Sequence, residues 1–122
     1  MTPDQPKNEW QRFVDAFRGI GILLARERHA RFHVCAALVV CLLGIVLEIS
    51  RYDWLMISIA IGLVIIAEAF NTAIEKMCDI IQPAYDIRIR NIKDMAAGAV
   101  LLSVCVAIVI GVVVFLPYLS RL

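Results

Sequence analysis

One segment of mixed apolar and charged positions precedes three long apolar segments in this chain. Within residues 9–31, apolar positions recur three or four apart with basic positions among them, which is typical of an amphipathic helix on a membrane surface. A helix packed on another subunit would give the same pattern. The apolar segments cover residues 32–49, 54–74 and 95–119, and each is long enough to cross a hydrocarbon core of about 30 Å. The pattern predicts an all-α integral membrane protein, with one surface helix and three transmembrane helices in a single domain, residues 1–122.

Composition supports this class. Hydrophobic residues make up 61% of the chain, and the mean hydropathy is +0.82, above the usage of soluble proteins. A net charge of +1 with scattered basic residues gives no nucleic-acid-binding face, so we expect no nucleic-acid partner. Residues 1–8 are polar, which predicts a disordered lead-in and no cleavable signal peptide. The four cysteines form no C-x-x-C pair, and we expect buried, inert thiols.

The distribution of Lys and Arg predicts the orientation in the membrane. Six of these residues precede the first apolar segment and four lie in the link 76–94, whereas the link 50–53 and the tail after residue 119 have one each. The positive-inside rule then places the N-terminus and the link 76–94 in the cytoplasm and the C-terminus outside. The predicted location is a cell membrane that the chain crosses several times, which becomes the bacterial cytoplasmic membrane with the family resemblance described below.

A polar stripe interrupts the second apolar segment. At about 100° per residue, the stripe members all lie within about 60° of Glu68 on one helix face. A carboxylate in such surroundings is a functional-site hypothesis by default. A second aligned carboxylate makes a divalent cation a natural partner. The members are Glu68, Asn71, Thr72, Glu75 and Asp79.

The stripe and the link after it suit phosphoryl transfer to a lipid alcohol. Glu68 lies deeper than Glu75, so it can meet a headgroup hydroxyl as a general base while Glu75 faces the aqueous nucleotide. Lys93 can neutralise phosphate oxygens. The sequence contains neither a G-x-x-x-x-G-K-[ST] loop nor the soluble protein-kinase signature, so the phosphates need another binding arrangement.

Other interpretations compete with this one. An oligomeric proton-coupled transporter could use Glu68 as a relay, although transporters tend to place such sites near the bilayer midplane. A membrane scaffold gives no reason for Glu68. Glu27 could form a surface ion pair, and Lys93 could be a positive-inside anchor. Asp94 could be the N-cap of the last helix.

Two histidines four residues apart, His29 and His33, have a spacing that can bind zinc on a helix. We interpret them instead as interfacial histidines without a metal.

Two sequence blocks resemble a known family. Residues 68–75 read E-A-F-N-T-A-I-E, followed by Asp79, and residues 93–101 read K-D-M-A-A-G-A-V-L. Together with residues 17–20 and the pair Glu27 and Arg31, they resemble the prokaryotic diacylglycerol kinase family, which includes undecaprenol kinases. The resemblance extends over residues 13–119.

The resemblance implies a homotrimeric membrane enzyme with active sites shared between subunits, a lipid alcohol as substrate, ATP as co-substrate and Mg²⁺ as cofactor. The small residues available for close helix approach are compatible with an oligomer. The implied roles are Glu68 as general base with Asn71 in support, Glu27 and Glu75 as metal ligands, Lys93, Asp94, Tyr85 and Asp86 as ATP contacts, Arg31, Ala97 and Glu68 as lipid contacts, and Asp79 as a supporting residue.

The choice of lipid rests on a few positions. Thr72 after Asn71, and the run of residues 96–101 after Lys93-Asp94-Met95, are closer to the undecaprenol kinase branch than to the diacylglycerol branch. We therefore expect undecaprenol, with diacylglycerol as the second choice. Asp86 after Tyr85 and the acidic Asp15 depart from the family pattern, which leaves the adenine contacts open.

Overall fold

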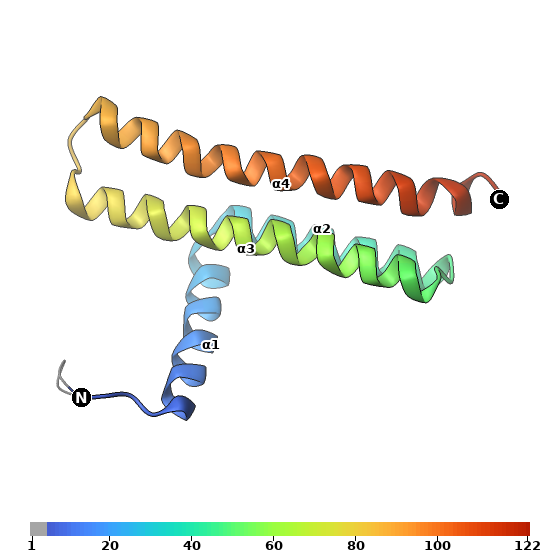
Figure 1. The fold of residues 1–122 in the computed structure, drawn as a ribbon, viewed down its shortest axis with the longest axis horizontal. Helices are drawn as coiled ribbons and strands as arrows, with labels where there is room; N and C mark the ends of the chain where they lie inside the picture. Colours follow the sequence, from blue (N-terminus) through green and yellow to red (C-terminus); the bar gives the residue numbers. More distant parts are fainter. Residues whose placement is uncertain (1–4) are drawn as a thin grey trace.

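The computed structural model describes residues 5–122 as four helices (Figure 1): α1 (Glu9–Arg26), α2 (Arg28–Val46), α3 (Arg51–Ile81) and α4 (Ile87–Leu119). Helix α3 runs antiparallel to both α2 and α4, and the three form an elongated bundle, whereas α1 is directed away from it. Residues 1–4 of the predicted lead-in lie outside the described residues.

Three of the helices, α2, α3 and α4, are long and apolar enough to cross a membrane. At 1.5 Å per residue, the 31 residues of α3 and the 33 of α4 extend over about 46 and about 50 Å, more than a hydrocarbon core of about 30 Å. Both helices therefore continue beyond the apolar layer. Within residues 5–122, the predictions of an all-α protein and of three helices able to span a membrane are confirmed.

The link predicted over residues 76–94 is mostly helical. Only residues 82–86 connect α3 to α4. Pro83 follows the end of α3, because proline lacks the N–H that continues a helix. Asp86 begins α4, and its side chain accepts a hydrogen bond from the Arg88 N–H at 2.9 Å. Asp94 lies two turns further on inside α4, so its alternative assignment as the N-cap is wrong.

The segment predicted as one surface helix, residues 9–31, is divided at Glu27. The backbone there is extended, with φ −110° and ψ 114°. The Arg31 guanidinium donates to the carbonyl oxygens of Leu24 and Ala25, at 3.0 Å each. These bonds satisfy carbonyl groups that the end of α1 leaves without helical partners. The break therefore lets α1 leave the bundle at an angle to α2.

No residue of α1 is buried, and most of its large apolar side chains are exposed, with Trp10 at 75% and Phe17 at 72%. A membrane surface would cover such a face. Its position on the membrane surface stays a prediction.

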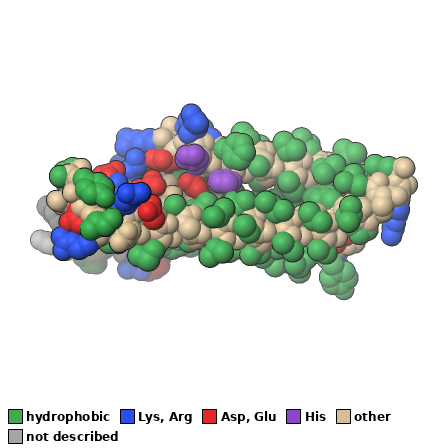
Figure 2. All heavy atoms as spheres, turned by 90° about the horizontal axis from the view of Figure 1, so that it is seen from above, with side chains coloured by type: hydrophobic (Ala, Val, Ile, Leu, Met, Phe, Trp, Pro, Cys, Tyr) green, Lys and Arg blue, Asp and Glu red, His purple; other side chains and the backbone are tan. Residues whose placement is uncertain are grey.

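The tightly packed part of the bundle lies where α2 leads into α3. Ile49, Ile57, Val114 and Phe115 form its buried cluster. Nearby, the Tyr118 hydroxyl on α4 donates to Asp53 Oδ2 on α3 at 2.6 Å and accepts from the Ser50 N–H at 3.0 Å. These contacts bind the last turns of α4 to the start of α3. Charged and histidine side chains gather at the opposite end, whereas hydrophobic side chains cover most of the remaining surface in Figure 2.

All four cysteines are free thiols, but not all of them are buried. Cys78 is buried and Cys41 is half-buried, whereas Cys35 and Cys105 are exposed on the bundle surface. The expectation of four buried thiols is wrong for the last two. Helix faces that point toward lipid are as apolar as a core, so the sequence pattern does not separate the two environments.

Gly44 tests this packing. A Cβ at this position would lie 2.8 Å from the Trp54 ring and 3.0 Å from Ile49 Cδ1. We expect Gly44→Ala to lower the free energy of unfolding by about 1–3 kcal/mol, because overpacking forces neighbouring atoms to move. The measurement is thermal unfolding of the detergent-solubilised protein. Gly21→Ala is the matched control, since a Cβ there meets nothing within 4 Å; equal stability of the two variants would contradict the prediction.

Candidate active site

Along α3, the polar stripe passes from buried to exposed positions. Glu68 is 5% exposed, and Asn71 and Thr72 are 9% exposed each. Glu75 is half-buried and Asp79 is exposed. The stripe predicted from the sequence therefore begins inside the bundle and ends at its surface. It forms the polar end of the bundle together with Glu27 and the first turns of α4.

An unpartnered polar atom lies beside Glu68. Asn71 Oδ1 is buried and has no hydrogen-bond partner within residues 5–122. A buried acceptor left unpaired costs about 1–3 kcal/mol. A bound group that donates a hydrogen bond would remove this cost, so the stripe has an acceptor available for a ligand.

Glu27 connects the break between α1 and α2 to α3. Its carboxylate Oε1 lies 3.0 Å from Lys76 Nζ, and Lys76 directly follows Glu75. A cavity of about 660 Å³ separates α1 from α3 here. Arg26, Glu27, Thr72 and Lys76 supply its polar lining. Glu27 thus pairs with Lys76 of α3, whereas the sequence suggested a surface ion pair with the arginines beside it, and this pair brings Glu27 to the turn of α3 that carries Glu75.

Lys93 joins α4 to the exposed end of the stripe. Its Nζ lies 2.5 Å from Asp79 Oδ1. Asp94 is exposed and lies 3.8 Å from the Arg90 Nε. Both residues also line a surface hollow of about 330 Å³ at the turn between α3 and α4, with Tyr85 and Asp86. The four residues expected to contact ATP are therefore neighbours around one hollow.

Asp86 has a local partner within this hollow. The Arg88 side chain donates to both of its carboxylate oxygens, at 2.8 and 3.1 Å, and the Arg88 N–H donates to one of them. The side-chain bonds first, and the backbone bond second, lower the pKa of Asp86 to about 2. Asp86 is thus a charged helix cap at neutral pH, and its contact with ATP stays a prediction.

Arg31 and Ala97 are the two other residues expected to contact the lipid. Arg31 is engaged by the carbonyl oxygens at the end of α1. Ala97 is exposed on α4, whereas its neighbour Ala96 is buried in the bundle. Neither position contradicts a lipid contact, and both assignments stay predictions.

His33 is a neighbour of Glu68 that the sequence analysis missed. Its Nε2 lies 3.7 Å from Glu68 Oε2, and the two side chains are 18% and 6% exposed. His29, one turn earlier, is exposed. His33 lies 17 residues before Ser50, and Glu68 lies 17 residues after Arg51, the first residue of α3. Because α2 and α3 form an antiparallel hairpin, these equal distances bring the two side chains to the same level. That equal spacing is the signal that could have identified the pair.

Divalent metal binding is compatible with the residues present. Within residues 5–122, no group of three His, Cys, Asp or Glu side chains forms a closed metal site. Mg²⁺ is usually held by one or two carboxylates, with waters and substrate phosphates completing its coordination. Glu27 is next to Lys76, the neighbour of Glu75, so two carboxylates are available at this level of α3.

Comparison with known proteins assigns the family. The profile of prokaryotic diacylglycerol kinase matches residues 14–115. The chain is 37% identical to the undecaprenol kinase of Bacillus subtilis (strain 168), over 98% of this chain and all of that protein. It is also 31% identical to the diacylglycerol kinase of Synechocystis sp. (strain PCC 6803), over 95% of this chain and 71% of that protein.

Together these matches cover the polar stripe of α3, the residues of the polar end on α4 and all three candidate membrane-spanning helices. They favour a kinase over a proton-coupled transporter built around Glu68. The chain belongs to the prokaryotic diacylglycerol kinase family and is an ATP-dependent lipid kinase with three candidate membrane-spanning helices.

Proposed function

We propose that this kinase transfers the γ-phosphate of ATP, bound with Mg²⁺, to the terminal hydroxyl of undecaprenol, with diacylglycerol as the second choice of lipid. The relative from Bacillus subtilis, named undecaprenol kinase, is more similar to this chain than the cyanobacterial diacylglycerol kinase is, at 37% against 31% identity. Thr72 and the residues after Met95 support the same choice.

The observation that carries the proposal is the buried Glu68 carboxylate beside the unpartnered Asn71 oxygen. Glu68 follows Arg51, the first residue of α3, by 17 residues, or about 26 Å along the helix axis. Measured from Arg51 at one boundary of a hydrocarbon core of about 30 Å, Glu68 lies close to the opposite boundary. A long-chain alcohol keeps its hydroxyl group at that boundary and its tail among the apolar helices.

Each residue of the polar end then has a distinct task. Glu68 accepts the proton of the lipid hydroxyl while the oxygen attacks the γ-phosphorus. Asn71 holds the hydroxyl or the phosphate through its amide. Phosphoryl transfer requires mainly positioning and charge neutralisation, which Lys93 contributes at the phosphate oxygens. Glu27 and Glu75 would hold Mg²⁺, which neutralises phosphate charge when bound.

The remaining predicted contacts complete the substrate sites. Asp94, Tyr85 and Asp86 line the hollow beside Lys93 and would contact the nucleotide. Arg31 and Ala97 would contact the lipid near its headgroup. Asp79 is a supporting residue that holds Lys93 in an ion pair until the phosphates replace it.

The same proposal includes a homotrimer with shared sites in a bacterial cytoplasmic membrane. A Cβ at Gly62, Gly98 or Gly111 would meet nothing within 4 Å, so a helix of a second chain can approach closely there. The excess of Lys and Arg at the polar end supports a cytoplasmic N-terminus and an external C-terminus. The exposed aromatic side chains of α1 fit a surface helix on the cytoplasmic side.

Replacing the proposed base tests the chemical step. We expect Glu68→Gln to lose about 10²- to 10⁴-fold in kcat, because the amide cannot accept the hydroxyl proton. The measurement is transfer of labelled γ-phosphate to undecaprenol or diacylglycerol by purified protein with MgATP. We expect faster transfer to undecaprenol.

Glu48→Gln is the matched control, since Glu48 lies in the turn between α2 and α3, away from the polar end. Near-normal transfer by a folded Glu68→Gln protein would remove Glu68 as the base. Faster transfer to diacylglycerol would reverse the order of lipids.

Replacing the proposed metal ligands tests the cofactor site. We expect Glu27→Gln and Glu75→Gln each to raise the Mg²⁺ concentration for half-maximal activity by about 10-fold or more, because even outer-shell changes weaken metal sites by that factor. The measurement is a Mg²⁺ titration at fixed ATP. Lys76→Gln breaks the ion pair with Glu27 and keeps both carboxylates, so it should not raise the requirement. Unchanged titrations for both Glu variants would exclude them as ligands.

Asp79 competes with the phosphates for Lys93. We expect Asp79→Asn to lower the KM for ATP by up to about fivefold, since an exposed ion pair contributes up to about 1 kcal/mol. We expect Lys93→Met to raise the same KM. Steady-state kinetics with varied ATP measure both effects. A higher KM for Asp79→Asn would mean that Asp79 assists nucleotide binding instead of opposing it.

A further inference from the structure

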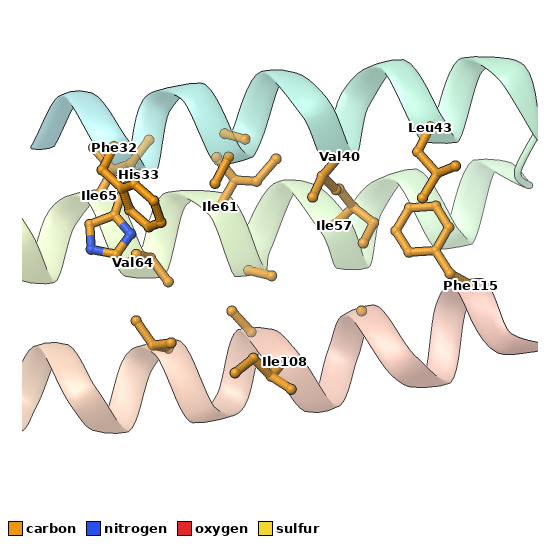
Figure 3. Close-up of a pocket in the computed structure, with 16 residues that line it drawn as sticks. Phe32, His33, Val40, Leu43, Ile57, Ile61, Val64, Ile65, Ile108 and Phe115 are labelled. Carbon is orange, nitrogen blue, oxygen red and sulfur yellow. The ribbon is translucent and has the colours of Figure 1, made fainter. Parts of the chain in front are cut away.

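His33 lies where an apolar cavity meets the carboxylate of Glu68. The cavity has a volume of about 360 Å³, and side chains of α2, α3 and α4 line it. Figure 3 shows His33 at one end of this cavity, with its ring pointing toward α3 and α4 beside Val64. Its Nε2 faces Glu68 Oε2 at 3.7 Å. One imidazole therefore borders both the apolar interior and the proposed base.

Glu68 has few other partners for a proton. Within the described residues 5–122, His33 is the one basic side chain within 4.0 Å of its carboxylate. The nearby lysines are held elsewhere, Lys76 by Glu27 and Lys93 by Asp79. Glu68 itself is 5% exposed, so direct access of water to its oxygens is small.

We propose that His33 is a proton-accepting and positioning residue for Glu68, an inference that rests on the proposed kinase function. In the transfer step, the lipid O–H bond breaks and its oxygen forms the new bond to the γ-phosphorus. The bond between the γ-phosphorus and the bridging oxygen breaks, and ADP leaves with that electron pair. The proton goes to Glu68 Oε2. It then passes to His33 Nε2, and the imidazolium releases it to water.

Imidazole suits this task better than the other basic side chains. A neutral ring nitrogen accepts a proton and returns it within the physiological pH range. A lysine or arginine at the same distance would hold Glu68 as a fixed ion pair and has no lone pair for its proton. The His33 side chain is 18% exposed and the Glu68 side chain 6%, so the imidazole is the more accessible of the two groups.

Chemical rescue separates this role from packing. We expect His33→Ala to lose about 10- to 100-fold in kcat, with the KM for ATP changed by less than about twofold, because proton transfer contributes on that scale or above it. Added imidazole should restore much of the lost kcat, because it fills the space with a basic ring. Pyrrole has the same ring size without a basic nitrogen and should not. His29→Ala is the matched control, an exposed histidine one turn away, and should keep wild-type kinetics.

Any of three results would overturn the inference. One is equal rescue by pyrrole, which would make His33 a packing residue. The others are a folded His33→Ala protein with wild-type kcat, and one whose loss imidazole does not restore. Should His33→Ala fail to fold, His33→Gln keeps a polar side chain of similar length, and wild-type kcat in that variant would equally exclude a proton acceptor.

The proposed function fails separately from this inference. Wild-type protein that transfers no phosphate to either lipid would remove the proposed lipid substrates. Active wild-type protein with an inactive Glu68→Gln variant and an unaffected His33→Ala variant would remove only the role of His33.

Discussion

The structure depends on holding one carboxylate inside a membrane-spanning helix. A charged side chain in such a helix costs roughly 3 kcal/mol or more, and the cost falls when the group lies near the boundary or has partners. Glu68 meets both conditions, because α3 carries it to the polar end and α2 supplies His33 beside it. The polar stripe then continues along α3 until Asp79 reaches the surface. Burial and exposure thus change along a single helix face, as a reaction between a lipid and a nucleotide requires.

The opposite end of the bundle makes this arrangement possible. Gly44 lets Trp54 pack directly against α2, and Tyr118 ties α4 to the start of α3. With the helices fixed there, the polar end needs little apolar packing of its own. It can keep ion pairs such as Lys93 with Asp79, which ligands are able to replace. The bundle therefore separates its tightly packed end from the polar end that carries the candidate site.

The ion pairs at the polar end neutralise charged side chains of the candidate site. Lys76 neutralises Glu27, and Asp79 neutralises Lys93. Under the proposed function, a divalent cation would replace Lys76 at Glu27, and nucleotide phosphates would replace Asp79 at Lys93. This exchange requires only side-chain movements of flexible lysines, so the helices themselves can stay in place.

The sequence by itself determined the helices, their membrane-spanning character and the polar stripe from Glu68 to Asp79, because hydrophobic length and helical periodicity are local properties. The E-x-x-N-T-A-I-E block also sufficed for the family. The extent of α3 and α4 beyond the apolar layer was underestimated, since polar residues of the link 76–94 continue a helix as well as they form a loop. Only the tertiary structure decided which side chains meet across helices: Lys76 with Glu27, Lys93 with Asp79, and His33 with Glu68. Such contacts depend on the rotation and register of packed helices, which the hairpin geometry and the close approach at Gly44 fix and which no single segment encodes.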